Sequence, residues 1–169
     1  MKSSKIFLMK KYKRYKTLEI YLNFSCNQRC LHCFNDDEFR LAHGNLEFKV
    51  VVETLFRMRK KGCNWFSLLG GEPTIYPNII KLISLAKKLG YKRIVTFSNG
   101  IKYSDKQFVS NMKKAGLTDT TLSIFGHTKD LHEAVTRVPG SFDKILKAIE
   151  NLQNEEIGIT VILVLNALN

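Results

Sequence analysis

The chain has 169 residues, of which 44% are hydrophobic and 25% are charged. This length suits one domain with a real core, and the composition is that of a globular protein, which excludes disorder of the whole chain. No apolar run approaches the roughly 20 residues of a membrane span. The apolar run at 6–9 is also far shorter than a signal-peptide core of about 7–15 residues. We therefore expect a single-domain cytoplasmic protein.

The formal net charge is +12, and the densest basic stretch lies in a lead-in at residues 1–16. This lead-in interleaves lysines and an arginine with tyrosines, which can bind phosphates and stack on bases. A solvated basic segment is the other interpretation. The charge favours an acidic partner, such as an acidic peptide or a nucleic acid, without choosing between them.

From residue 17 onward, runs of strand character alternate with amphipathic stretches of helical spacing. We expect strands at 17–23, 64–69, 92–97, 119–125 and 157–165, and helices at 46–61, 77–89, 104–115 and 141–154. Residues 24–45 are predicted to form a long loop. The last strand is almost wholly apolar, which is typical of a strand covered on both faces. The alternation predicts an α/β fold with parallel strands, in an open doubly wound sheet or a barrel.

Polar and glycine-rich groups follow four of the predicted strands, where both architectures gather their functional residues. These groups are the cysteine loop, Gly70-Gly71-Glu72-Pro73, Ser98-Asn99-Gly100, and Ser123. The second and third could also be simple turns, and Ser123 could only satisfy backbone groups. Their shared position at one rim of the fold indicates a functional site. His127 and His132 follow the fourth strand, and we expect them in a loop or at the surface.

Three of the four cysteines, Cys26, Cys30 and Cys33, form a CxxxCxxC motif. Their clustering fits metal binding in a reducing compartment better than a disulfide framework. Thiolates are the usual ligands of iron–sulfur clusters, and three ligands on a four-iron cube leave one iron open for chemistry. The alternative is zinc with His32 or a distant residue as the fourth ligand, although the sequence lacks the second ligand pair usual in structural zinc sites. The isolated Cys63 is predicted to be a small buried residue.

These motifs resemble the radical S-adenosylmethionine (SAM) superfamily from about Leu18 to the end of the chain. CxxxCxxC after the first strand is the signature of that family. The family's Gly-Gly-Glu-Pro segment and third-strand ending are similar to GGEPTIYPNIIKLISLAKKLGY and TFSNG. Members that modify peptides and carry a C-terminal auxiliary-cluster domain are similar in SIFGHTKDLHEAVTRVPGSFDKILKAI. The resemblance implies a partial parallel (β/α) barrel over 17–169, with about five strand–helix units and an apparent truncation after the fifth strand.

The resemblance also implies the roles of individual residues. Cys26, Cys30 and Cys33 would ligate three irons of a four-iron four-sulfur cluster, and the amino and carboxylate groups of SAM would chelate the fourth. The backbone of 70–72 would approach the SAM amino group, and Glu72 would accept a hydrogen bond from it. A side chain at Gly71 would then occupy the space of the methionine moiety. The other implied SAM-binding residues are Gly70, Pro73, Ser98, Asn99, Ser123, Leu163 and Asn166.

Two positions depart from the peptide-modifying relatives. Thr136 stands where an arginine is frequent, with Arg137 at the glycine that follows, and Phe125 replaces an aspartate. We expect these departures at the rim to alter substrate choice more than cluster chemistry.

The activity that the resemblance implies is reductive cleavage of SAM to a 5′-deoxyadenosyl radical, which abstracts hydrogen from a substrate. A ribosomally made peptide is one candidate substrate, and flavodoxin or ferredoxin is a candidate electron donor. The rival hypothesis is a non-enzymatic zinc- or nucleic-acid-binding module built from the cysteine loop and the basic lead-in. An uncovered edge at the apolar fifth strand would allow self-association.

Overall fold

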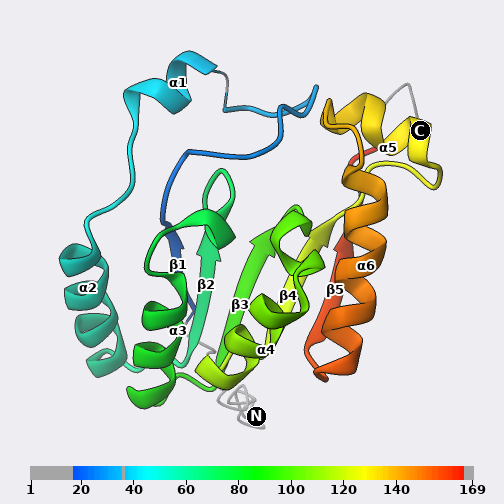
Figure 1. Ribbon diagram of the computed structural model, residues 1–169. Coiled ribbons are helices and arrows are strands. Elements are labelled where there is room, and N and C mark those ends of the chain that lie inside the picture. Colours follow the sequence, from blue (N-terminus) through cyan, green and yellow to red (C-terminus); the bar gives the residue numbers. More distant parts are fainter. Residues whose placement is uncertain (1–16, 36, 166–169) are drawn as a thin grey trace, which may run out of the picture.

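The computed structural model describes residues 17–35 and 37–165, and five parallel strands form a single sheet (Figure 1). The neighbour order equals the chain order, and each strand pairs in parallel with the next. The predicted strands are confirmed, with a shorter last one: β1 (Thr17–Tyr21), β2 (Trp65–Leu69), β3 (Arg93–Ser98), β4 (Asp119–Ser123) and β5 (Gly158–Ile162).

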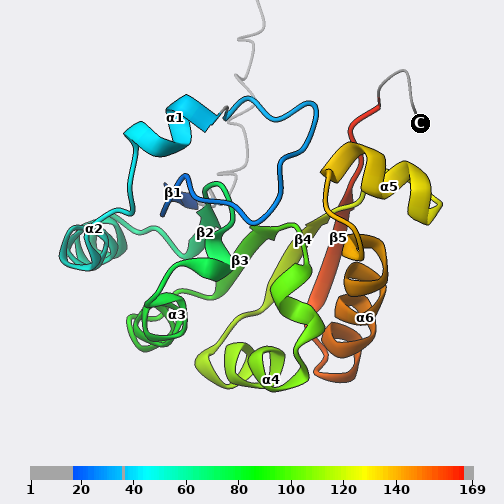
Figure 2. The same ribbon diagram turned by 45° about the horizontal axis from the view of Figure 1, so that its top comes forward.

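The sequential strand order decides between the two architectures that the sequence allowed. A doubly wound sheet reverses its strand order and carries helices on both faces. Here every crossover steps in the same direction, so right-handed connections place the helices on one face. Figure 2 shows this arrangement for α2 (Phe48–Lys60), α3 (Ile79–Lys88), α4 (Lys106–Ala115) and α6 (Ser141–Asn154). The unclosed sheet is therefore part of a parallel (β/α) barrel, as expected.

The core lies between the sheet and these helices. In β1 the alternation is strict, because Leu18 and Ile20 are buried while their neighbours are exposed. Tyr103, on the short 3-10 helix η2 (Ile101–Ser104), is fully buried, and its hydroxyl lies 2.6 Å from the Oγ1 of Thr96 on β3. Cys63 is 2% exposed, which confirms that it is a small buried residue.

Two helices were not predicted, and both lie beside the ends of the strands. Within the predicted loop, α1 (Asp37–Ala42) forms, and α5 (Lys129–Thr136) follows β4. The hydroxyl of Thr128 caps α5 by accepting a hydrogen bond from the Leu131 amide at 3.4 Å. His132 is fully buried on this helix, so the expectation of a loop or surface position for it is wrong.

The expectation that the fifth strand is covered on both faces is also wrong. Val161 and Leu163 are about half exposed, at 53% and 50%, and Leu165 is 78% exposed. Within the described residues β5 pairs with β4 alone. Self-association through this edge stays a prediction. The basic lead-in at 1–16 lies outside the described residues. None of the helices in the described part of the chain is long and apolar enough to cross a membrane.

Candidate functional site

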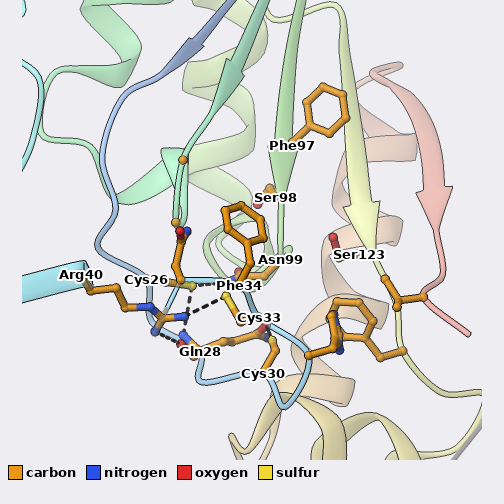
Figure 3. Close-up of a pocket in the computed structure, with 16 residues that line it drawn as sticks. Cys26, Gln28, Cys30, Cys33, Phe34, Arg40, Phe97, Ser98, Asn99 and Ser123 are labelled. Atoms are coloured by element: carbon orange, nitrogen blue, oxygen red, sulfur yellow. Dashed lines mark hydrogen bonds between the residues drawn. The ribbon is translucent and has the colours of Figure 1, made fainter. Parts of the chain in front are cut away.

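A cavity of about 460 Å³ opens at the carboxyl ends of the strands (Figure 3). It brings together eight of the residues that the sequence predicted for the site, from the cysteine loop and the ends of β2, β3 and β4: Cys26, Cys30, Cys33, Gly70, Gly71, Ser98, Asn99 and Ser123. The parallel strands produce this convergence, because all their carboxyl ends meet at one rim.

The other predicted residues lie elsewhere. Glu72 and Pro73 are buried and do not line the cavity. Leu163 is 50% exposed, and its neighbour Val164 lines the cavity instead. Successive residues of an extended segment point to opposite sides, which explains the exchange. Asn166 lies outside the described residues.

The cysteine loop is bonded to β2 on one side of the site. The amide of Gly71 donates to the carbonyl of Asn23 at 2.8 Å, and the amide of Glu72 donates to the carbonyl of Ser25 at 2.9 Å. The Nδ2 of the Asn23 side chain donates a hydrogen bond to the Glu72 carbonyl at 3.0 Å. These bonds continue the β1–β2 pairing into the loop and fix the chain immediately before Cys26.

The middle of the loop is bonded to α5. The amide of Arg29 donates to the carbonyl of Thr136 at 3.2 Å, and the amide of Leu31 donates to the carbonyl of Val135 at 2.9 Å. Carbonyls in the last turn of a helix have no intrahelical partner, so they are available for such docking. The two bonds flank Cys30 and hold it beside the last turn of α5.

Close packing explains the glycine pair. A Cβ at Gly70 would overlap the backbone and side-chain oxygens of Asn23. A Cβ at Gly71 would lie 2.7 Å from the Phe24 carbonyl carbon and would overlap the carbonyl oxygens of Phe24 and Ser25. The expectation that a side chain at Gly71 would fill the methionine space is therefore wrong, because the cysteine loop occupies that space. The backbone of both glycines still faces the cavity.

Glu72 joins the ends of β2 and β3 from beneath the cavity. Its Oε1 accepts hydrogen bonds from the Thr74 amide (3.0 Å), the Thr74 hydroxyl (2.6 Å) and the Ser98 hydroxyl (2.8 Å). Its Oε2 accepts from the Asn99 amide at 2.7 Å. Burial raises the pKa of this carboxyl, and the four hydrogen bonds oppose that rise. The carboxylate thus orients Ser98 and Asn99, while its predicted bond with SAM stays a prediction.

The three sulfurs have different neighbours. The Cys26 sulfur accepts from the Gln28 amide at 3.4 Å and from Asn99 Nδ2 at 3.7 Å, and the Cys30 thiol donates to Gln28 Oε1 at 3.4 Å. Arg40 reaches in from α1 and donates from Nη2 to the Cys33 sulfur at 3.2 Å (Figure 3). Burial raises the pKa of Cys26, and burial together with the two neighbouring thiols raises the pKa of Cys30 to about 12. Metal binding must therefore displace these protons.

The donor set fits a cluster better than a single ion. In the described part of the chain, no group of three His, Cys, Asp or Glu side chains converges on one metal ion. A four-iron cluster does not need such convergence, because each thiolate binds a different iron. The cavity also holds two buried polar atoms without a hydrogen-bond partner in the described structure, Gln28 Nε2 and Asn35 Oδ1. Such atoms cost about 1–3 kcal/mol each when unpaired, so the cavity suits a ligand with both donors and acceptors.

Aromatic side chains form the wall on the β4 side. The rings of His32 and Phe125 lie edge to face, with centroids 4.5 Å apart. The Phe125 amide donates to Nδ1 of buried His132 at 3.3 Å. This path links the cysteine loop to α5 through side chains, beside the two backbone bonds. Sequence reasoning missed His132 and Arg40 because both lie on helices that were not predicted. The local signals for α5, an N-cap residue at Thr128 and the apolar residues Leu131 and Val135, are too few to separate a helix of eight residues from a loop.

Sequence comparison assigns the class of this site. The family model described as the radical SAM superfamily matches residues 20–169. The chain belongs to this superfamily, whose members bind a 4Fe–4S cluster and SAM. The confirmed family overrides the rival hypothesis of a zinc- or nucleic-acid-binding module.

Curated relatives of this chain include proteins that are named as enzymes. The chain is 28% identical over 138 residues to a probable GTP 3′,8-cyclase of Saccharolobus solfataricus, covering 79% of this chain and 42% of the relative. It is 26% identical over 147 residues to the Fe-coproporphyrin III synthase of Methanosarcina barkeri, covering 85% and 35%. The chain thus spans less than half the length of these relatives.

Solved structures share the fold. The structure of anSMEcpe with bound AdoMet and Kp18Cys peptide is 22% identical, with a TM-score of 0.70 over 86% of this chain and 42% of that chain. Identity this low shows the fold alone. The structural similarity confirms that the unclosed five-stranded sheet has the fold of part of a radical SAM barrel.

Proposed function

We propose that residues 17–169 form the cofactor-binding domain of a radical SAM enzyme, with Cys26, Cys30 and Cys33 as the cluster ligands. One observation carries this proposal: the three thiols share one cavity with the ends of β2, β3 and β4. When bound there, the cluster and SAM would supply an organic radical, generated by reductive cleavage of SAM, that removes hydrogen from a substrate. The protein supplies ligation, orientation and exclusion of water.

The polar rim residues bind and orient SAM in this proposal. The backbone of Gly70 and Gly71 borders the cavity without side chains, so a ligand can approach it closely. Ser98 and Asn99 are positioned by the buried carboxylate of Glu72 and offer side-chain donors and acceptors. Ser123 lies across the cavity at the end of β4 (Figure 3). Pro73, Leu163 and Asn166 are assigned to SAM by family resemblance alone.

The substrate class is the finer part of the proposal. A peptide is supported by the resemblance of residues 123–149 to peptide-modifying members, and anSMEcpe was solved with a peptide. GTP is the second candidate, because the relatives named GTP 3′,8-cyclase share 28–31% identity with this chain. The net charge of +12 suits either an acidic peptide or a triphosphate. Stimulation of 5′-deoxyadenosine formation by peptides or by GTP distinguishes the two.

The cluster needs a one-electron donor and a reducing compartment. Flavodoxin and ferredoxin are the proposed donors, and the cytoplasm is the proposed location. The four cysteines are free thiols, which supports this placement.

The ligand assignment is tested with single cysteine variants. We expect Cys26→Ala, Cys30→Ala and Cys33→Ala each to lose most of the iron and sulfide after anaerobic reconstitution, because two thiolates hold the cube weakly. Cys63→Ala is the matched control, since this thiol is buried in the core away from the cavity. Wild-type iron content in all three loop variants would contradict the assignment.

A further inference from the structure

A second, smaller hollow adjoins the cysteine loop. Its volume is about 290 Å³, and it shares Cys30, Cys33, Asn35 and Arg40 with the main cavity. Its own walls add Arg29 and Arg137. Cys30 and Cys33 therefore border both the SAM-side cavity and this hollow.

The described lining of the hollow is basic. Three arginines line it, and none of the described residues that line it is acidic. Arg29 and Arg137 are both exposed. Arg29 donates from Nη1 to the carbonyls of Cys26 and Gln28 at 2.9 and 3.1 Å. Arg137 ends α5 in a left-handed conformation, with φ of 56°. It lines the hollow and not the main cavity, so its place is beside the outer part of the cluster loop.

Apolar side chains accompany the charges. Leu31 lines the hollow and is 48% exposed, and Phe34, on the same loop, is 79% exposed but lines the main cavity. Exposed apolar side chains beside arginines are typical of a protein-binding surface, where arginine and aromatic residues are enriched. A small anion would need the arginines but would have no use for Leu31.

We infer that this hollow is the docking surface for an acidic one-electron carrier protein. The inference rests on the proposed function, because it needs the cluster on Cys30 and Cys33. Charge complementarity supports it: a negative surface on the carrier meets three arginines at the place where two cluster ligands border the hollow. In the reaction, the carrier loses one electron and the cluster gains one, with no proton transfer.

The test measures cluster reduction with two reductants. Anaerobically reconstituted protein is mixed with reduced flavodoxin, an acidic carrier, and cluster bleaching is followed by stopped-flow absorbance. Photoreduced deazaflavin, a small molecule without a docking surface, serves as the second reductant. The variant is Arg137→Glu, because Arg137 lines the hollow and does not line the main cavity. Lys92→Glu is the matched control, because it makes the same charge change at an exposed residue beside the opposite end of β3.

We expect Arg137→Glu to slow reduction by flavodoxin about tenfold at low salt, since local charge steers association by roughly 10- to 1,000-fold. The difference should shrink between about 20 and 500 mM salt, as the Debye length falls from roughly 20 to 4 Å. Lys92→Glu should change the rate less than twofold, and deazaflavin should reduce all three proteins equally.

Equal effects of the two variants on the flavodoxin rate would overturn the docking assignment. So would an unchanged flavodoxin rate in Arg137→Glu. If that variant instead weakens GTP binding in equilibrium dialysis, the hollow serves a phosphate-bearing substrate and the inference is wrong. Failure of the wild-type protein to assemble a cluster contradicts the proposed function itself, and is seen before any reductant is added.

Discussion

Gly71 is the position where the smallest chemical change should have the largest effect on the site. In Gly71→Ala the new methyl group would lie 2.7 Å from the Phe24 carbonyl carbon, whereas ordinary contacts begin near 3.4 Å. The obstacle is backbone, which cannot rotate away as a side chain can. Either the end of β2 or the start of the cysteine loop must therefore move by more than about half an ångström.

The cost can be worked from the contacts at this place. Overpacking that forces backbone shifts costs about 1–3 kcal/mol. The same shift stretches the Gly71–Asn23 and Glu72–Ser25 backbone bonds, each of which contributes about 0.5–1.5 kcal/mol. If both bonds are lost, we expect a total loss of about 2–6 kcal/mol in the free energy of unfolding, a large part of the usual 5–15 kcal/mol.

Denaturant unfolding of the reduced, cluster-free protein measures this loss. Iron and sulfide content after reconstitution then reports whether Cys26 has moved, and we expect less cluster in Gly71→Ala. The matched control is Gly44→Ala, because a Cβ at Gly44 would meet no atom within 4 Å. The control should match wild type in both measurements. A Gly71→Ala protein with wild-type stability and full cluster content would refute the packing argument.

Three further predictions concern buried or charged groups around the site. Burial raises the pKa of the Glu72 carboxyl, so the folded protein holds this proton more tightly than the unfolded chain does. The resulting stabilisation is complete below the ordinary pKa of a glutamate and is lost as pH rises through the raised pKa. The advantage of wild type over Glu72→Gln in unfolding free energy should therefore shrink with rising pH. Burial lowers the pKa of His132, so wild type should lose stability as pH falls below about 6.5, and His132→Phe should lose less over that range. Arg40→Gln removes the positive charge beside the Cys33 sulfur. The iron content should be unchanged, and a redox titration should show a more negative cluster potential, because the lost charge favoured the reduced cluster.

The sheet and the cavity could be predicted because local signals determine them. Each strand is marked by its own apolar pattern, and polar residues that follow parallel strands must meet at one rim. That rule predicts that Cys30, Ser98 and Ser123, residues distant in sequence, line one cavity. The choice between barrel and doubly wound sheet needed the strand order, which no local pattern specifies.

Other features of the site could not be predicted, because they depend on contacts between distant segments. Glu72 is buried because Thr74, Ser98 and Asn99 together supply four donors, and two of these residues belong to another strand end. His132 is buried because the short helix α5 packs it between Phe125 and Phe142. An eight-residue helix has too few turns for a periodic signal to separate it from a loop.

The central claim is that this chain holds a cluster with one iron open to SAM. Electron paramagnetic resonance of the reduced, reconstituted protein, recorded with and without SAM, tests it most directly. We predict about four irons and four sulfides per chain, and a cluster signal that changes when SAM is added. A signal that SAM leaves unchanged, or a colourless protein with one bound zinc, would contradict the account.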